Sequence, residues 1–360
     1  MTSQRVRLGL WGARGDRRGL AIQAGEFARH MRPERVMGFD LRGVRDSALP
    51  LDWSDYAGSD LTVMHAAKVT RELALSWMDG LDVVWAVETW YQPDLFPAWA
   101  REAGVRTIQH VNPEFYRYDR EPLLPRPDLE LAPTDWRLRE MSGVRGVLPT
   151  PIALDRLPFA QRGWGEPLTF LHVVGVPAAA DRNGIEILRA ALPLVRVPCQ
   201  LLVMQQGGGG CTLSTGQVGE VVVEVRVGDL ARYWELYDEG DVLVLPRRYG
   251  GQCLPVQEAA ARGLPSLMTD VSPQTGWLPP ECMVPTDGFN VLATQGGAIE
   301  AHSANPMALA AAMDRMSTED GLVQRLSAVA RAWAETLGWT TMLPRYEQAL
   351  WVGKRDPDLP

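Results

Sequence analysis

The sequence contains little lysine, few cysteines and no long hydrophobic run. Lys68 and Lys354 are the only lysines among 36 basic residues, so arginine carries almost all of the positive charge. The cysteines lack the C-x-x-C spacing that is typical of zinc sites and redox pairs. This pattern argues against a disulfide framework and predicts a cytoplasmic protein, because thiols stay reduced there. The four residues are Cys199, Cys211, Cys253 and Cys282.

The hydrophobic residues are spread through the sequence in short runs. The first ten residues are charged and have no apolar core, which argues against a signal peptide. No run approaches the roughly 18 apolar residues of a transmembrane helix, so we expect no membrane span. A length of 360 residues with 46% hydrophobic and 22% charged residues predicts two globular domains of ordinary size.

The net charge of −8 is unevenly distributed. An acidic total argues against a protein that coats nucleic acid or a membrane with its whole surface. Residues 1–45, however, hold ten arginines against four acidic residues, which gives this segment +6 and leaves −14 for the rest. Chance combined with arginine-rich codon usage explains such a segment, and so does a domain face that meets a polyanion.

Short apolar runs alternate with amphipathic segments in the first half of the sequence. Such alternation predicts a parallel sheet with helices on both faces. We expect strands at residues 6–11, 35–40, 83–87, 105–110, 129–133 and 147–149, with helices after residue 19, at 95–102 and at 136–141.

A second alternation follows a proline-containing connection. We expect strands at residues 169–174, 200–204, 220–227, 241–245 and 266–269, and helices at 185–194, 230–238, 256–262 and within 306–351. The predicted fold class is α/β, with two Rossmann-like doubly wound domains facing across a ligand cleft. The expected parts are a first domain at 1–150, a connection at 151–167, a second domain at 168–330, and further helices plus a tail at 331–360.

The most informative segment runs from Asp241 to Asp270. A buried strand ends at Pro246, and a glycine-rich turn leads into a helix whose first backbone N–H groups can bind phosphate. Arg247 and Arg248 follow the strand and can bind a diphosphate through charge-assisted hydrogen bonds. Glu258, one turn into the helix, can accept hydrogen bonds from the two vicinal hydroxyls of a ribose.

This segment resembles the carboxy-terminal signature of GT-B glycosyltransferases, especially the retaining family called GT4. The resemblance makes Glu258 the ribose ligand. The first of the two family glutamates would fall on Gly250, so the acidic residue that supports the sugar is absent. The alternative is a generic strand–turn–helix connection with a glutamate by chance. The backbone cradle implied by the resemblance consists of Gly251, Gln252, Cys253 and Leu254.

Other segments agree with this resemblance in order and spacing. The resemblance makes residues 1–150 the acceptor-side domain and residues 168–330 the donor domain, and implies that the helices at 331–360 cross back to the first domain. Residues 170–175 and 181–184 resemble the first strand and phosphate-binding turn of the second domain, with Val176 and Asn183 replacing the usual basic residues. Arg182 is the remaining basic group and is implied to bind the diphosphate. Gly15, in the loop 12–19, matches the glycine-rich first loop that approaches donor phosphate and acceptor.

Three residues of the first domain are candidate catalytic groups. Residues 105–110 resemble the strand that ends in a family histidine contacting the transferred sugar, here His110. A lone histidine at a strand end is more often a residue that makes a structural hydrogen bond. Glu88 ends the strand 83–87, and Glu114 follows soon after His110.

The resemblance implies transfer of a glycosyl group from a nucleoside-diphosphate sugar to a hydroxyl, with retention at the anomeric carbon. Arginines and backbone amides would stabilise the leaving group, without a metal or a covalently bound cofactor. The arginine-rich sequence and residues 246–255 resemble phage-encoded members, some of which glycosylate hydroxymethylated pyrimidines in DNA. The basic amino-terminal segment suits a DNA backbone, and the base would be flipped out of the duplex. Such a protein would work in the bacterial host cytoplasm. A cell-surface glycan, a lipid and a small molecule are alternative acceptors.

Functions of other classes stay open at this point. Asp40 follows the first strand and glycine loop at a distance that suits a nicotinamide-binding Rossmann oxidoreductase. The glycines run G-x-x-G-x-x-x-G, however, and not G-x-G-x-x-G. A non-catalytic sugar-nucleotide binder and an epimerase with the same fold are further alternatives.

Overall fold

The computed structural model describes residues 5–351, apart from 17, 43–50, 66–67, 89–94, 117–124, 160–163, 165, 176–180, 206–211, 229, 231 and 295–296. The sequence forms two compact units. Unit 1 contains residues 1–150, 295–297 and 339–360, and unit 2 contains residues 151–294 and 298–338.

Unit 1 is built on a seven-stranded sheet in the order β3-β2-β1-β4-β5-β6-β7. Every neighbouring pair is parallel. The central strands β1 and β4 are buried along their whole length, as expected for a sheet covered on both faces. The strands are β1 (Leu8–Ala13), β2 (Arg35–Asp40), β3 (Asp60–His65), β4 (Val83–Val87), β5 (Arg106–His110), β6 (Leu129–Ala132) and β7 (Val144–Val147).

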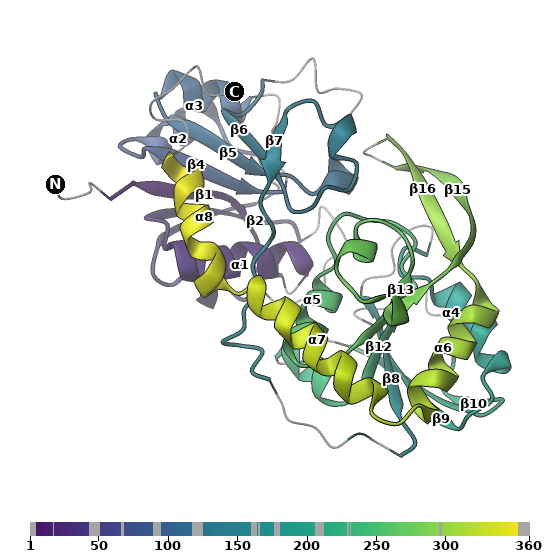
Figure 1. Ribbon diagram of the computed structural model, residues 1–360. Helices are drawn as coiled ribbons and strands as arrows, with labels where there is room; N and C mark the ends of the chain where they lie inside the picture. The colour runs from purple at the N-terminus through teal and green to yellow at the C-terminus, as the bar shows by residue number, and fades with distance from the viewer. Residues whose placement is uncertain are drawn as a thin grey trace. The chain divides into compact units, whose positions relative to one another are not determined.

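Four helices cover the sheet of unit 1: α1 (Gly19–Met31), α2 (Arg71–Met78), α3 (Phe96–Glu102) and α8 (Trp339–Trp351). The last helix, α8, lies beside α1 (Figure 1). Tyr346 of α8 packs against Trp85 with ring centroids 5.4 Å apart, and its hydroxyl donates to the Pro149 carbonyl at 3.2 Å. Arg106 donates to the carbonyls of Ala349 and Leu350 at 2.6 and 2.7 Å. The guanidinium therefore caps the carboxyl end of α8.

Unit 2 contains a second seven-stranded sheet, in the order β10-β11-β9-β8-β12-β13-β14. Its pairs are parallel except β10 with β11. Its strands are β8 (Thr169–Gly175), β9 (Cys199–Gln205), β10 (Gly216–Val218), β11 (Val221–Val227), β12 (Val242–Leu245), β13 (Ser266–Thr269) and β14 (Met283–Val284). Its helices are α4 (Ile185–Ala191), α5 (Leu254–Ala261), α6 (Pro306–Thr318) and α7 (Leu322–Thr336), and a separate hairpin consists of β15 (Thr286–Thr294) and β16 (Gly297–Ala304).

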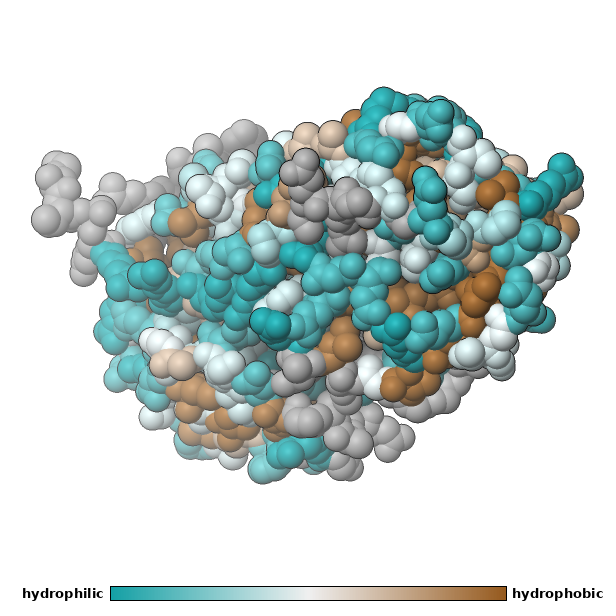
Figure 2. All heavy atoms as spheres, turned by 90° about the horizontal axis from the view of Figure 1, so that it is seen from below, coloured by the Kyte–Doolittle hydropathy of each residue, from teal (hydrophilic) through white to brown (hydrophobic). Residues whose placement is uncertain are grey.

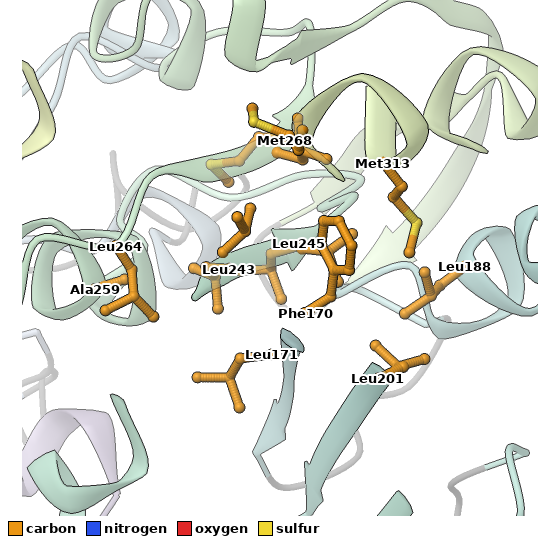
Figure 3. Packing of buried hydrophobic residues seen from close by; sticks show 14 of the residues in the cluster. Phe170, Leu171, Leu188, Leu201, Leu243, Leu245, Ala259, Leu264, Met268 and Met313 are labelled. Carbon is orange, nitrogen blue, oxygen red and sulfur yellow. The ribbon is translucent and has the colours of Figure 1, made fainter. Parts of the chain in front are cut away.

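The core of unit 2 is formed by the strands and the helices that cover them. Figure 3 shows Leu188 of α4 with Met313 of α6 at one end of the cluster, and Ala259 of α5 with Leu264 at the other. Strand side chains such as Phe170 lie between them and are fully buried. Each such side chain stabilises the fold by roughly 1.5–3 kcal/mol. On the face drawn in Figure 2, hydrophobic side chains form separate patches among hydrophilic ones.

The doubly wound α/β class predicted from the sequence is confirmed, and several element boundaries differ. The strands expected at 35–40 and 83–87 are β2 and β4. The helix expected at 230–238 is instead a 3₁₀ helix at Tyr233–Asp238, and the strand expected at 147–149 lies at Val144–Val147. Strand β3, helix α2 and the hairpin β15–β16 were not expected. The residues of β3 are all half-buried or exposed, because the strand lies at the sheet edge, and its apolar signal is correspondingly weak.

Candidate functional site

The candidate site of unit 2 lies where the strand order of its sheet reverses. From β8 the chain proceeds outward through β9 and β11, then returns to β12 on the other side of β8. In open α/β sheets, ligands bind outside the carboxyl ends of the strands at such a switch point. The turn after β8 includes residues 181–184, and the turn after β12 covers residues 246–253.

These two turns are in direct contact. Gly184 has a φ of +76°, and a Cβ there would overlap the Pro246 carbonyl oxygen and lie 2.9 Å from its carbon. The backbone N–H of Arg248 donates to the carbonyl of Arg182 at 2.9 Å. Asp181 accepts hydrogen bonds from the N–H groups of Ile185 (2.7 Å) and Glu186 (3.1 Å), and burial raises its pKa. The carboxylate therefore caps α4 and holds the first turn to this helix.

A histidine side chain lies between β8 and β12 at this point. The two strands pair at Phe170–Val242 and Leu171–Leu243, and the next residue, His172, places Nδ1 2.8 Å from the carbonyl oxygen of Val244. Burial lowers the pKa of His172 to about 4, so the ring is neutral. Because a carbonyl can only accept, Nδ1 carries the proton. The imidazole thus ties the two strands together where they lead into the two turns.

Arg247 is buried within the second turn, with only 2% of its surface exposed. Its backbone N–H donates to the Leu245 carbonyl at 2.6 Å, and its Nε donates to the Tyr249 carbonyl at 2.9 Å. The guanidinium lies beside Gly250, where a Cβ would overlap Nη2 and lie 2.8 Å from Cζ. It therefore occupies the space next to the residue on which the first family glutamate would fall.

Arg248 is directed to the hairpin β15–β16. Its Nε donates to the His302 carbonyl at 3.2 Å, and its Nη2 donates to Asn290 Oδ1. In return, the N–H of His302 donates to the Arg248 carbonyl at 2.9 Å. This guanidinium therefore anchors the hairpin to the turn, whereas Arg182 is half-buried in the first turn.

The remaining residues of the cradle lead into α5. Gly251, Gln252 and Cys253 are buried, and Leu254 is half-buried as the first residue of the helix. Pro255 lies in the first turn, where its missing N–H costs nothing and its fixed φ favours helix formation. The positive end of the α5 dipole therefore lies at this turn.

Glu258 is buried one turn into α5, with 7% of its surface exposed. Its Oε2 accepts a hydrogen bond of 2.5 Å from the hydroxyl of Tyr237, which lies in the 3₁₀ helix before β12. Burial, together with the charge of Glu258, raises the pKa of Tyr237 well above its usual value. The tyrosine is therefore a permanent donor that orients the carboxylate. Sequence reasoning missed Tyr237; its place just before a wholly buried strand was the available signal.

In unit 1 the strand order reverses between β1 and β4, and Glu88 directly follows β4. Its φ of +69° is unusual for a residue with a side chain and costs about 1–3 kcal/mol. Hydrogen bonds hold it in place: its N–H donates to the His110 carbonyl (2.7 Å), its carbonyl accepts from Gln109 Nε2 (2.8 Å), and its Oε2 accepts from Asn112 Nδ2 (2.6 Å). Glu88 and the end of β5 are thus brought together.

His110 and Glu114 are both buried at the carboxyl end of β5. Nε2 of His110 lies 2.7 Å from the carbonyl oxygen of Leu148, and burial lowers the pKa of His110 to about 4. The ring is therefore neutral, with its proton on Nε2, and it lies edge-on to Trp85 and Tyr346. Glu114 lies in the short 3₁₀ helix Pro113–Phe115.

Gly15 packs against an aromatic ring in the loop after β1. A Cβ on Gly15 would lie 2.7 Å from Cε2 of Trp53. The carbonyl of Gly15 accepts a hydrogen bond of 2.7 Å from the N–H of Asp52. The neighbouring Arg14 and Asp16 form a buried ion pair. The lack of a side chain at residue 15 therefore lets this loop lie flat on Trp53.

The arginines of residues 1–45 do not gather at one edge of the sheet in the part of unit 1 that the structure describes. Arg7 and Arg35 lie where β1 and β2 begin, whereas Arg14 and Arg42 lie where these strands end. All four acidic residues of the segment are paired with its arginines, in Arg7–Glu34, Arg14–Asp16, Arg29–Glu26 and Arg42–Asp40. Among the described residues of this segment, arginines therefore lie at both ends of the strands.

Asp40 is the residue on which the nicotinamide alternative depends. Arg42 donates to its two carboxylate oxygens through Nε at 3.0 Å and Nη2 at 2.8 Å, and lowers the pKa of Asp40 to about 2. A carboxylate already engaged bidentately is poorly suited to receive ribose hydroxyls, which weakens this alternative.

Both units have the Rossmann-like architecture, and together they correspond to the GT-B fold. A scan of protein-family models and a search of curated proteins gave no match. Among solved structures, the chain resembles Anabaena HepE in complex with UDP (TM-score 0.67, 12% identity, 96% of this chain and 100% of HepE covered).

Two further solved structures support the same fold. One is the sucrose-phosphate synthase from Thermosynechococcus elongatus (TM-score 0.67, 15% identity, 97% and 99% covered). The other is the apo lipopolysaccharide outer core galactosyltransferase WaaB (TM-score 0.62, 12% identity, 96% and 99% covered). These similarities confirm the GT-B fold that the resemblance implied. Among the described residues, no helix has the length and apolar character needed to cross a bilayer.

Proposed function

We propose that the protein is a glycosyltransferase that transfers a sugar from a nucleoside-diphosphate donor to a hydroxyl group. The observation that carries this proposal is the buried Glu258–Tyr237 pair at the start of α5, located at the switch point of unit 2. A carboxylate oriented by a permanent donor suits the two vicinal hydroxyls of a ribose. The fold supports the proposal further, because HepE was solved with UDP and with UDP-glucose.

In this proposal, the turns next to Glu258 bind the diphosphate. The first amides of α5, Arg247 and Arg182 stabilise the charge that develops on the leaving group, without a metal. The bond between the anomeric carbon and the β-phosphate oxygen breaks, and the electron pair stays on the phosphate. The acceptor oxygen forms the new bond on the same face, and its proton passes to the departing phosphate, which gives retention.

Donor binding is the first test. In a thermal-shift panel of UDP, GDP, ADP and TDP with their glucose conjugates, at least one ligand raises the melting temperature, because it binds only the folded state. Glu258→Ala abolishes that shift. Glu319→Ala, which changes an exposed glutamate of the same unit, leaves it intact. A shift that survives Glu258→Ala would refute the ribose assignment.

For the acceptor, we propose a hydroxymethylated pyrimidine in DNA, in the bacterial cytoplasm. Its support is the resemblance to phage-encoded members and the positive charge of residues 1–45, of which only part lies at the ligand-binding edge of unit 1. DNA containing hydroxymethylcytosine should gain the mass of one hexose when incubated with the bound donor. A gain on a small-molecule, glycan or lipid acceptor instead would refute the DNA assignment.

Within unit 1, we propose that Glu88 orients the acceptor hydroxyl, with His110, Glu114 and Gly15 shaping its surroundings. The strained backbone of Glu88, held by hydrogen bonds to His110, Gln109 and Asn112, supports this role. A non-catalytic sugar-nucleotide binder is the competing function. It would bind a donor without releasing nucleoside diphosphate in the presence of any acceptor.

A further inference from the structure

Gly250 differs from the other residues of the turn at 246–253 because a side chain there would meet the guanidinium of Arg247. Its φ of +126° lies in the region that favours glycine. A Cβ would overlap Arg247 Nη2 and lie 2.8 Å from Cζ and 3.0 Å from Nε. Any side chain at residue 250 therefore displaces the guanidinium.

The position of Arg247 depends on this short turn. Its Nε donates to the carbonyl of Tyr249, so the side chain folds back over the residues that immediately follow it. With 2% of its surface exposed, it has little room to adopt another rotamer without disturbing its neighbours. The space left by the missing Cβ of Gly250 is the space in which the guanidinium lies.

We propose that Gly250 is a positioning residue that holds Arg247 at the start of α5, where the guanidinium binds the donor diphosphate. This inference rests on the proposed function. A guanidinium has five N–H donors and no acceptor, so it binds phosphate oxygens well and cannot accept a hydrogen bond from a sugar hydroxyl. The guanidinium next to Gly250 therefore suits the anionic diphosphate of the donor.

The first test measures the coupling between the two residues without any ligand. Gly250→Ala introduces both the unfavourable φ and the collision with Arg247. Gly288→Ala is the matched control, because Gly288 has a φ of +137° and no atom within 4 Å of its Cβ position. Gly250→Ala should lower the melting temperature more than Gly288→Ala does, and most of the difference should disappear in the Arg247→Ala background. Equal effects of Gly250→Ala in both backgrounds would overturn the inference.

The second test measures binding by titration calorimetry with UDP, GDP, ADP, TDP and the corresponding nucleosides. Gly250→Ala should weaken binding of the preferred diphosphate about tenfold or more, the loss expected for one charge-assisted hydrogen bond. It should leave nucleoside binding unchanged. The double variant with Arg247→Ala should lose no more than Arg247→Ala alone.

The outcomes separate the inference from the proposed function. Additive losses in the double variant, or equal losses for nucleoside and diphosphate, would overturn the role of Gly250. If the wild-type protein binds none of these nucleotides, the proposed function fails together with the diphosphate role of Arg247. The stability cycle would still decide whether Gly250 positions Arg247.

Discussion

Replacing Tyr237 by phenylalanine tests the arrangement on which the ribose assignment depends. The change removes one hydroxyl and keeps the buried ring. The hydroxyl donates to Glu258 Oε2 at 2.5 Å, and both residues are buried. A hydrogen bond to a charged group contributes about 1.5–3 kcal/mol, and its loss leaves the carboxylate without this donor in a buried site. We therefore expect unit 2 to lose about 1.5–3 kcal/mol of unfolding free energy.

Tyr346→Phe provides the matched control in unit 1. Its hydroxyl is also buried, but it donates to the neutral carbonyl of Pro149 at 3.2 Å. Such a bond contributes only about 0.5–1.5 kcal/mol. Urea unfolding, followed separately for the two units by hydrogen exchange, measures both changes. A loss in Tyr237→Phe no larger than in Tyr346→Phe would refute the reasoning.

The same tyrosine predicts a pH dependence. Burial raises the folded-state pKa of Tyr237 above its value of about 10 in the unfolded chain. A raised pKa means that its contribution to stability is fully present below pH 10 and is lost as the pH rises further. Unit 2 of Tyr237→Phe should therefore lose less stability above pH 10 than unit 2 of the wild type. Equal losses would contradict this explanation.

Three further predictions concern other buried or strained groups. Burial lowers the pKa of His172 to about 4, so its contribution of about 3 kcal/mol to stability is present above pH 6.5 and is lost as the pH falls toward 4. In His172→Asn, the unfolding free energy of unit 2 should therefore fall less between pH 6.5 and pH 4 than in the wild type. An equal fall would contradict a neutral buried ring. Glu88→Ala should slow turnover at least tenfold with little change in donor affinity. Glu88→Gly should be about 1 kcal/mol more stable than Glu88→Ala, because glycine adopts the φ of +69° without strain. Equal stabilities of the two variants would argue against a strained backbone. Arg106→Met should raise hydrogen exchange in the last turn of α8, because the carbonyls of Ala349 and Leu350 lose their donor; unchanged exchange would refute the capping role.

The turn between β12 and α5 could be predicted from the sequence because its signals are local. A wholly apolar strand, two consecutive glycines, a proline and Glu258 follow one another within 20 residues. Each has a physical meaning that needs no tertiary contact: a buried strand, a tight turn, a helix start and a carboxylate one turn later. The confirmed doubly wound class rests on the same kind of local periodicity.

The roles of individual side chains depended on contacts between residues far apart in sequence. Arg248 contacts the hairpin residue His302, 54 positions away, and Tyr237 meets Glu258 from a different element. No local pattern distinguishes Arg247, whose side chain lies within the turn, from Arg248, whose side chain contacts the hairpin β15–β16. The charge of residues 1–45 is a sum over the sequence, and it does not tell at which end of the strands each arginine lies.

The position of α8 has a consequence for the order in which the protein is completed during synthesis. Trp339, Met342, Tyr346, Ala349 and Leu350 belong to the buried cluster of unit 1, together with Leu10, Phe27 and Trp85. The other strands and helices of unit 1 leave the ribosome before α8 is synthesised, while unit 2 is still being translated. The first unit to emerge is therefore the last to close its core. A nascent chain stalled before residue 339 should expose an apolar surface along α1 that chaperones recognise, whereas unit 2 is by then fully synthesised.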